Sequence, residues 1–214
     1  MTRNQPEDSY WWQPLEADAD DSARAQILDA AYREIHLHGF QAASLSRILK
    51  RTGVTKGALY HHFPNKTALG LAVIDEVLAR RIELSFIQPL TNAEDPVEAL
   101  IGIIEEAGSS FTLCDVELGC PLSTLSQEMA SLDEDFRQRL MAIYERWRQA
   151  LEDAFRRQQA AGRLDPAVDP ETLSTMVVAT MDGCLQAGKI SQSLQRLLQC
   201  GSALIQYLKM IQRP

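Results

Sequence analysis

The segment Gly119-Cys120-Pro121 places a thiol where helix geometry can activate it. Proline is favoured at the first position of a helix, so a helix that starts at Pro121 has Cys120 as its N-cap residue. The unpaired backbone N–H groups and the positive dipole end at that position lower the pKa of a thiol. Asp115 and Glu117 lie nearby in the sequence and oppose this effect. The pattern predicts a sensor thiol at Cys120, and the alternative is a cysteine buried for packing.

The chain has four cysteines but no C-x-x-C pair, so we expect neither a structural zinc site nor any other metal centre. In a reducing compartment the cysteines are expected to be free thiols that pack as small hydrophobic residues. They are Cys114, Cys120, Cys184 and Cys200. All four histidines lie between residues 36 and 62, where we expect surface and DNA-facing roles.

Enzymatic chemistry finds little support in the sequence. Residues 67–214 contain no histidine, which excludes Ser-His-Asp and Cys-His catalysis from that region. No nucleotide-binding loop, H-E-x-x-H motif or paired-carboxylate motif is present. We therefore expect neither an enzyme nor a bound cofactor, although an enzyme on an all-α scaffold is kept as an alternative.

The segment SLSRILKRTGVTKGALYHHF, residues 44–63, has the features of a helix-turn-helix that reads DNA. One short amphipathic helix braces a second across a turn that contains Gly53, so that the second helix can enter the major groove. Thr55 and Lys56 stand at the start of that second helix, where free N–H groups favour a phosphate, and Gly57 allows close backbone approach. An ordinary helical hairpin with a solvated basic face is the alternative.

The charge distribution supports a nucleic-acid partner for this module alone. The whole chain has a net charge of −8. Residues 22–66 contain seven basic and two acidic residues, a net charge of +5, whereas residues 1–21 contain one basic and six acidic residues, a net charge of −5. A compact basic module on an acidic body is expected where one part meets phosphate.

The elements that must position these residues are all helical. Apolar residues recur at helical spacing from residue 22 almost to the end, with a fourth helix over about 65–86 and candidate helices at 96–112, 121–131, 134–161, 170–189 and 193–211. The fold is predicted to be all-α, with an N-terminal three-helix DNA-binding module and a C-terminal helical bundle. Residues 1–21 are predicted to be a flexible acidic arm, in which Tyr10-Trp11-Trp12 docks onto the body of the protein.

The order of residues over about 22–70 resembles the TetR (tetracycline-repressor-like) family. The resemblance is carried by Gly39-Phe40, Gly53-Val54, Lys56-Gly57 and Leu59-Tyr60 among others. It implies a homodimer that binds a palindromic operator and is released by a small ligand in the C-terminal domain. The candidate DNA-contact residues are Ser44, Arg47, Thr55, Lys56, Gly57, Tyr60, His61 and Lys66. Many members have a basic arm before the first helix, whereas residues 1–21 of this chain are acidic. We therefore do not expect this arm to contact the minor groove.

The stretch GCPLSTLSQEM resembles a branch of this family that includes repressors of N-ethylmaleimide reductase and acrylate-responsive regulators. This implies a reactive electrophile or oxidant as ligand, sensed at Cys120. Lys189, within QAGKIS, falls in another segment that resembles the branch, and an amine near a thiolate would favour it. The small residues Ala179, Gly183, Ala187 and Gly188 would permit close helix approach across a dimer axis.

The predicted domains are an arm over 1–21, a DNA-binding domain over 22–82 with its helix-turn-helix at 45–64, and a ligand-binding and dimerisation domain over 83–214. No export signal or membrane span is apparent, which predicts a cytoplasmic protein. A ligand-responsive repressor is the leading hypothesis. One alternative is an activator or architectural DNA binder that recognises no small molecule. Another is an activator or repressor with a non-covalent ligand and purely structural cysteines.

Overall fold

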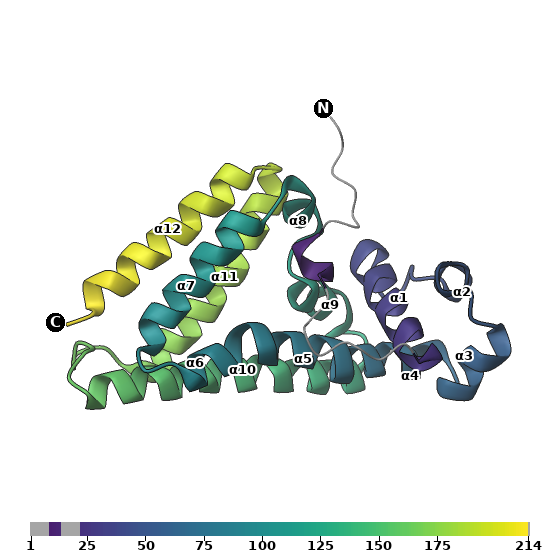
Figure 1. The fold of residues 1–214 in the computed structure, drawn as a ribbon, viewed down its shortest axis with the longest axis horizontal. Helices are drawn as coiled ribbons and strands as arrows, with labels where there is room; N and C mark the ends of the chain where they lie inside the picture. The colour runs from purple at the N-terminus through teal and green to yellow at the C-terminus, as the bar shows by residue number, and fades with distance from the viewer. Residues whose placement is uncertain (1–8, 14–21, 214) are drawn as a thin grey trace. The chain divides into compact units, whose positions relative to one another are not determined.

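The computed structural model describes residues 9–13 and 22–213, and these residues are helical almost throughout (Figure 1). Within them, β-pairing is limited to one isolated bridge between Leu164 and Gln212. The all-α prediction is confirmed. No helix in the described part of the chain is long and apolar enough to cross a membrane.

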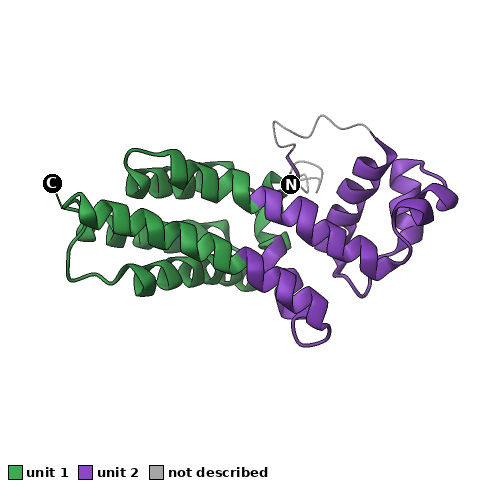
Figure 2. Cartoon of the chain, turned by 90° about the horizontal axis from the view of Figure 1, so that it is seen from below, with its two compact units in different colours: residues 1–11, 82–120, 144–214 green, residues 12–81, 121–143 purple. Residues whose placement is uncertain are grey.

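The chain divides into two compact units (Figure 2). Unit 1 consists of Met1–Trp11, Ile82–Cys120 and Tyr144–Pro214, and unit 2 of Trp12–Arg81 and Pro121–Ile143. The units therefore cut across the contiguous domains 22–82 and 83–214 expected from the sequence, because residues 121–143 belong with the N-terminal helices.

Unit 2 contains the helices of the basic module. They are α1 (Ala23–His38), α2 (Leu45–Thr52), α3 (Lys56–His62) and α4 (Lys66–Ala72), with α9 (Pro121–Met129) packed against α1. Ile27, Ala31 and Leu59 are fully buried and form part of the core beneath α2 and α3. The helix-turn-helix predicted from the sequence is present.

Short polar residues begin these helices, as the sequence indicates. Each N-cap side chain accepts a hydrogen bond from the backbone N–H three residues on, which satisfies one of the unpaired donors of the first turn. The caps of α1 to α4 are Ser22, Ser44, Thr55 and Asn65. Gly39 and Gly53 end α1 and α2 with φ values of 80° and 70°, which residues with a Cβ rarely adopt.

The fourth predicted helix, about 65–86, is longer than expected. Helical structure continues to Asn92 through η3 (Val73–Leu78), α5 (Ala79–Ile82), η4 (Glu83–Ile87) and α6 (Gln88–Asn92). Pro89, which lies beyond the predicted end at about residue 86, stands inside this continuous helical stretch, near the start of α6. The wider π-helical turns of η4 precede it.

Unit 1 is built on α7 (Pro96–Ser110), α11 (Pro170–Ser191) and α12 (Leu194–Ile211), which lie side by side (Figure 1). The C-terminal part of α10 (Glu134–Ala160) belongs to the same unit. The sequence did not predict α8 (Leu113–Leu118), a six-residue helix held by a capping box between Thr112 and Asp115. Its single apolar face is too short to give a clear period.

The acidic arm contains a docked turn, η2 (Tyr10–Trp12). Ser9 is fully buried, and its hydroxyl donates to Asp115 Oδ1 at 2.6 Å. This agrees with the prediction that the aromatic segment docks onto the protein, and it shows that residues 9–13 are not a flexible arm. The rest of the predicted arm, residues 1–8 and 14–21, lies outside the described residues.

Two residue-level expectations are wrong. Cys184 and Cys200 are not free thiols, because a disulfide joins them between α11 and α12, whereas Cys114 and Cys120 are free and buried. His36 is not a surface residue, since its side chain is buried and its Nδ1 accepts a hydrogen bond from Trp12 Nε1. Both pairs are distant in sequence, so only tertiary packing brings them together.

Gly70 should resist substitution because a Cβ there would overlap the Phe40 ring and lie 2.9 Å from Phe136 Cζ. Overpacking of this kind costs about 1–3 kcal/mol, which exceeds the gain of up to about 1 kcal/mol in helix propensity. Gly70→Ala should therefore lower the free energy of unfolding measured in urea. Gly102→Ala is the control, because its Cβ would meet nothing within 4 Å, and it should be neutral or stabilising.

Candidate nucleic-acid interface and thiol site

The recognition surface predicted on α3 is open to solvent. Thr55, Lys56, Gly57 and His61 are exposed, and Tyr60 is 43% exposed although it is a large aromatic residue. Lys56 Nζ lies 5.8 Å from the centre of the Tyr60 ring, one turn along the same helix. Together they form a polar, positively charged surface that is open to solvent.

Ser44 and Arg47 have partners inside unit 2. Arg47 Nε donates to Glu34 Oε1 at 2.6 Å, and the backbone N–H of Ser44 donates to the same oxygen at 2.9 Å. The Arg47 guanidinium also donates to the carbonyl of Ala42. Arg47 therefore holds the connection between α1 and α2, and its half-exposed side chain can still present its remaining N–H groups to a phosphate.

Lys66 likewise has a local role. Its ammonium donates to the carbonyl of Gln41 at 2.8 Å and lies 5.0 Å from the centre of the Phe40 ring. An ammonium has three donors, so one contact leaves two for an anion.

Two acids that the sequence analysis did not single out position this surface. Glu34 is 8% exposed, and its pKa is below the ordinary value: burial acts to raise it, but hydrogen bonds from Arg47 and Ser44 and the nearby charge of His38 outweigh burial. Glu128 of α9 accepts hydrogen bonds from the backbone N–H groups of Phe40 and Gln41 at 2.7 and 2.8 Å. Glu34 could have been noticed as one of two acids in a basic module, whereas nothing local distinguishes Glu128.

Cys120 is 9% exposed and directly precedes Pro121, where α9 begins, as predicted. Its thiol forms a hydrogen bond with Asp182 of α11, which also accepts one from Tyr144 Oη at 2.6 Å. Burial raises the pKa of Asp182, although the Tyr144 and Cys120 hydrogen bonds oppose the rise. Asp182 was not predicted, because a mid-helix acid has no local signal for burial beside a thiol.

Lys189 Nζ donates to the carbonyl of Leu118 at 2.9 Å, two residues before Cys120. The structure thus brings Lys189 to the chain segment that carries the thiol. The Lys189 ammonium contacts the backbone of this segment, at the Leu118 carbonyl. Among the described residues, no group of three or more His, Cys, Asp and Glu side chains is arranged to hold a metal ion.

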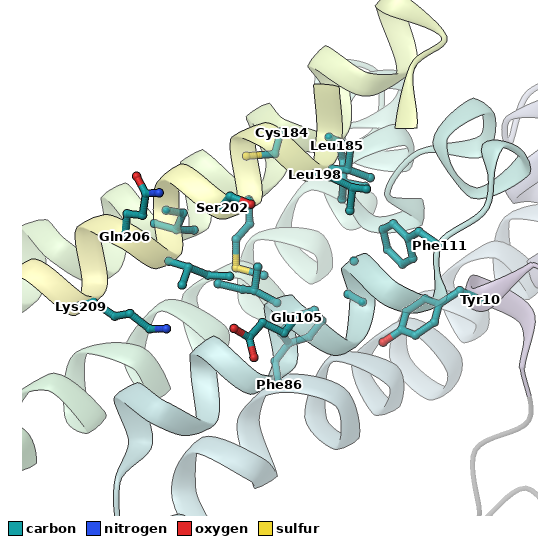
Figure 3. Close-up of a pocket in the computed structure, with 18 of the residues that line it drawn as sticks. Tyr10, Phe86, Glu105, Phe111, Cys184, Leu185, Leu198, Ser202, Gln206 and Lys209 are labelled. Atoms are coloured by element: carbon teal, nitrogen blue, oxygen red, sulfur yellow. The ribbon is translucent and has the colours of Figure 1, made fainter. Parts of the chain in front are cut away.

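Unit 1 also contains a cavity of about 580 Å³ between α7, α11 and α12 (Figure 3). Its walls are mostly apolar and include Phe86, Phe111 and Leu185, with the Cys184 end of the disulfide. The volume is in the range of small-molecule sites in proteins.

Two families of known proteins match this chain. Residues 27–73 match the family described as "Bacterial regulatory proteins, tetR family". Residues 96–203, half of the chain, match the family described as "Tetracyclin repressor-like, C-terminal domain".

Individual relatives are similar to this chain over most of their length. The transcriptional regulator AcuR of Cereibacter sphaeroides is 29% identical over 171 residues, which cover 78% of this chain and 77% of AcuR. The crystal structure of regulatory protein TetR from Rhodobacter sphaeroides is 26% identical, with a TM-score of 0.74 and coverage of 86% of this chain and 98% of the other. The reduced form of E. coli NemR has a TM-score of 0.76 at 22% identity, covering 90% and 98%, which shows a common fold.

The Glu34 carboxylate should make the stability of the protein depend on pH. Its folded pKa is lower than the ordinary 4.5, so its contribution is fully present above about pH 4.5 and is lost as the pH falls through the folded value. Glu34→Gln should cost about 1–3 kcal/mol at neutral pH, because a hydrogen-bonded charge is removed, and less at about pH 3.5. Urea unfolding at both pH values measures the difference.

The matched control is Asp29→Asn, because Asp29 is half exposed and pairs with Arg33 one turn away on the same helix. It should cost about 0.5 kcal/mol or less. A Glu34→Gln penalty that is equal at both pH values would contradict the assignment of a lowered pKa to Glu34.

Proposed function

This chain belongs to the TetR family of DNA-binding transcriptional regulators, and we propose that it is a homodimeric repressor released from a palindromic operator by a small molecule. The observation that carries the proposal is the exposed, basic helix-turn-helix on a compact unit, joined to a second unit that contains a cavity and a free buried thiol. Members of the family are regulators, so the enzyme alternative is set aside.

Operator recognition is proposed to involve two copies of α3 in successive major grooves. In such a dimer, Thr55, Lys56 and Gly57 approach phosphates, while Tyr60 and His61 reach base edges. Ser44, Arg47 and Lys66 position the backbone of the module and add phosphate contacts through their remaining donors. The DNA-binding modules of the two subunits each bind one half-site, and the half-sites lie one helical turn apart. The proposed operator is therefore a short inverted repeat.

The dimer surface is proposed to lie on α11 and α12. Ala179, Gly183 and Ala187 form an exposed stripe of small residues on α11, whereas Gly188 faces inward and would place a Cβ 3.1 Å from Leu197 Cβ. Ile190 is 75% exposed on the same helix. On α12, Met210 is 81% exposed and Tyr207 is also exposed. Large apolar side chains left in water are stabilised by a partner surface.

The proposed response begins with addition of the Cys120 thiol to an electrophile such as a maleimide. The S–H bond breaks and the sulfur forms a bond to the β-carbon of the activated C=C. A proton is then added at the α-carbon. Overall, one S–H adds across one double bond. Asp182, which is hydrogen-bonded to the thiol, is proposed to accept the departing proton. Lys189, whose ammonium donates to the carbonyl of Leu118, is proposed to assist as a positive charge beside this segment.

Helix α9 offers a route from the thiol to the DNA-reading surface. It begins at Pro121, the residue after Cys120, and its Glu128 holds the backbone of Phe40 and Gln41 between α1 and α2. A bulky adduct at Cys120 would move the start of α9. A few kcal/mol of preference for the moved state is enough to release DNA.

A second candidate function is a regulator with a non-covalent ligand and structural cysteines. The cavity favours it, because its mostly apolar walls leave room for a small molecule and include neither Cys114 nor Cys120.

Lys56→Ala and Lys66→Ala should each weaken binding to operator and to random DNA alike, and each should reduce the slope of affinity against salt by about one. Tyr60→Ala should instead weaken operator binding more than random binding, because a base contact carries sequence information. Gel shifts at several salt concentrations measure both effects.

The control is Arg196→Ala, an exposed basic residue of α12 outside the module, which should leave DNA binding unchanged. If the Lys56 and Lys66 variants both bind as wild type at all salt concentrations, the assigned DNA-binding face is wrong.

Cys120→Ser should bind operator normally yet resist release by N-ethylmaleimide, quinones or hypochlorite, because it lacks the nucleophilic sulfur. The measurement is release from labelled operator at increasing reagent, with mass spectrometry of the adduct.

Cys114→Ser is the matched control, since Cys114 is the other free, buried cysteine, and it should be released as wild type is. Cys184→Ser and Cys200→Ser should also still be released. Release of Cys120→Ser at the wild-type dose would end the sensor hypothesis and leave the non-covalent regulator.

A further inference from the structure

The cavity of unit 1 is closed at one end by residues that come from the far N-terminal part of the chain. Tyr10 and Trp11 line it together with residues of α7, α11 and α12. Tyr10 lies beside Phe111 at one end, and Lys209 lies at the other (Figure 3). The docked turn is thus part of the cavity wall.

Three aromatic rings meet at this end. The Tyr10 and Phe111 ring centres are 4.8 Å apart, those of Trp11 and Phe111 are 5.1 Å apart, and those of Tyr10 and Trp11 are 5.6 Å apart. All three pairs are edge-on or tilted, which is a favourable arrangement for aromatic rings. They add to the apolar cluster of Phe111, Val116, Cys184 and Leu197.

The turn is held by one carboxylate. Asp115 Oδ1 accepts hydrogen bonds from Ser9 Oγ at 2.6 Å and from the backbone N–H of Tyr10 at 2.7 Å, and the carbonyl of Asp115 accepts one from Trp11 Nε1 at 3.3 Å. Asp115 Oδ2 is occupied by Thr112. This attachment fixes two aromatic side chains against the cavity without a covalent bond.

The lining selects against charged ligands. Glu105 and Lys209, the charged side chains of the cavity lining, are both exposed. A charged group of a ligand that enters the apolar part of the cavity would lose its hydration and find no counter-charge there, which is strongly unfavourable. An uncharged, ring-containing molecule instead gains apolar burial and aromatic contacts.

We propose that the Ser9–Trp11 turn and the cavity form one binding site for uncharged aromatic molecules, with Tyr10, Trp11 and Phe111 as its ring-recognition wall. The inference deepens the proposed function, on which it rests for the link between ligand binding and DNA release. The site is separate from Cys120, which is not among the cavity-lining residues.

The turn has a direct chain connection to the DNA-binding module. Trp12, the residue after Trp11, belongs to unit 2, where it is 2% exposed and donates to His36 Nδ1 of α1. The Arg33 guanidinium lies 5.5 Å from the centre of the Trp12 ring. A ligand that shifts Trp11 therefore acts one peptide bond away from an anchor in the module that reads DNA.

The test is a fluorescence titration of the full chain with the neutral probe N-phenyl-1-naphthylamine, in the absence of DNA. Trp11→Ala should weaken probe binding about tenfold and Tyr10→Ala about three- to tenfold, because each removes one aromatic wall contact. Met141→Ala is the control, since Met141 is 56% exposed on α10 and lies outside the cavity lining, and it should bind as wild type.

Gly201→Leu gives an independent test that leaves the turn intact. A Cβ at Gly201 would make ordinary contact with Ile104 at 3.5 Å, so a larger side chain fills the cavity without a backbone clash, and probe binding should fall at least tenfold. Circular dichroism checks that each variant is folded. Wild-type affinity in folded Trp11→Ala, or in folded Gly201→Leu, would overturn the proposal.

A gel shift with and without the probe separates this inference from the proposed function. Probe binding that depends on Trp11 but leaves operator affinity unchanged supports the site and counts against ligand-controlled repression through it. Operator release by the probe that persists in Trp11→Ala would overturn the proposed role of the turn while supporting a ligand-responsive repressor.

Discussion

The buried carboxylate of Asp115 organises the part of unit 1 on which the proposed ligand recognition depends. Its side chain is fully buried, and it accepts four hydrogen bonds, two from Ser9 and Tyr10 and two from Thr112. A buried acid is tolerated only when donors of this kind replace its hydration. The same residue thus caps α8, holds the N-terminal turn and fixes the aromatic end of the cavity. Removing it would disturb all three features together.

Unit 2 uses carboxylates in a similar way within a basic module. Glu34 binds Arg47 and the backbone of Ser44, and Glu128 binds the backbone of Phe40 and Gln41. Gly39 suits this connection because its φ of 80° is one that residues with a Cβ rarely adopt, and a Cβ there would also lie 2.7 Å from Glu128 Oε2. These contacts shape the connection between α1 and α2, and so the presentation of the helix-turn-helix. The two acids thus give the connection between α1 and α2 a defined geometry.

Two routes toward the DNA-binding unit start in different parts of unit 1. One begins at Cys120, which is hydrogen-bonded to Asp182 and is followed directly by α9. The other begins at the aromatic wall of the cavity. Trp11 belongs to this wall, and the next residue in the chain is Trp12. Under the two proposals, a covalent and a non-covalent signal reach the same module through different segments, because Cys120 is followed directly by α9 and Trp11 directly by Trp12.

The sequence by itself determined the helical class, the helix-turn-helix and most helix ends, because apolar period, N-cap residues such as Ser44 and Thr55, and Gly53 act within a few neighbouring residues. It also indicated that Tyr10-Trp11-Trp12 docks, since exposed tryptophans are unfavourable in water. Only the tertiary structure decided the partner of that segment, the burial of His36, the Cys184–Cys200 bond and the placement of Asp182 beside Cys120. Each of these joins residues that are distant in the chain or lie on different helices, and local propensity contains no information about such pairs.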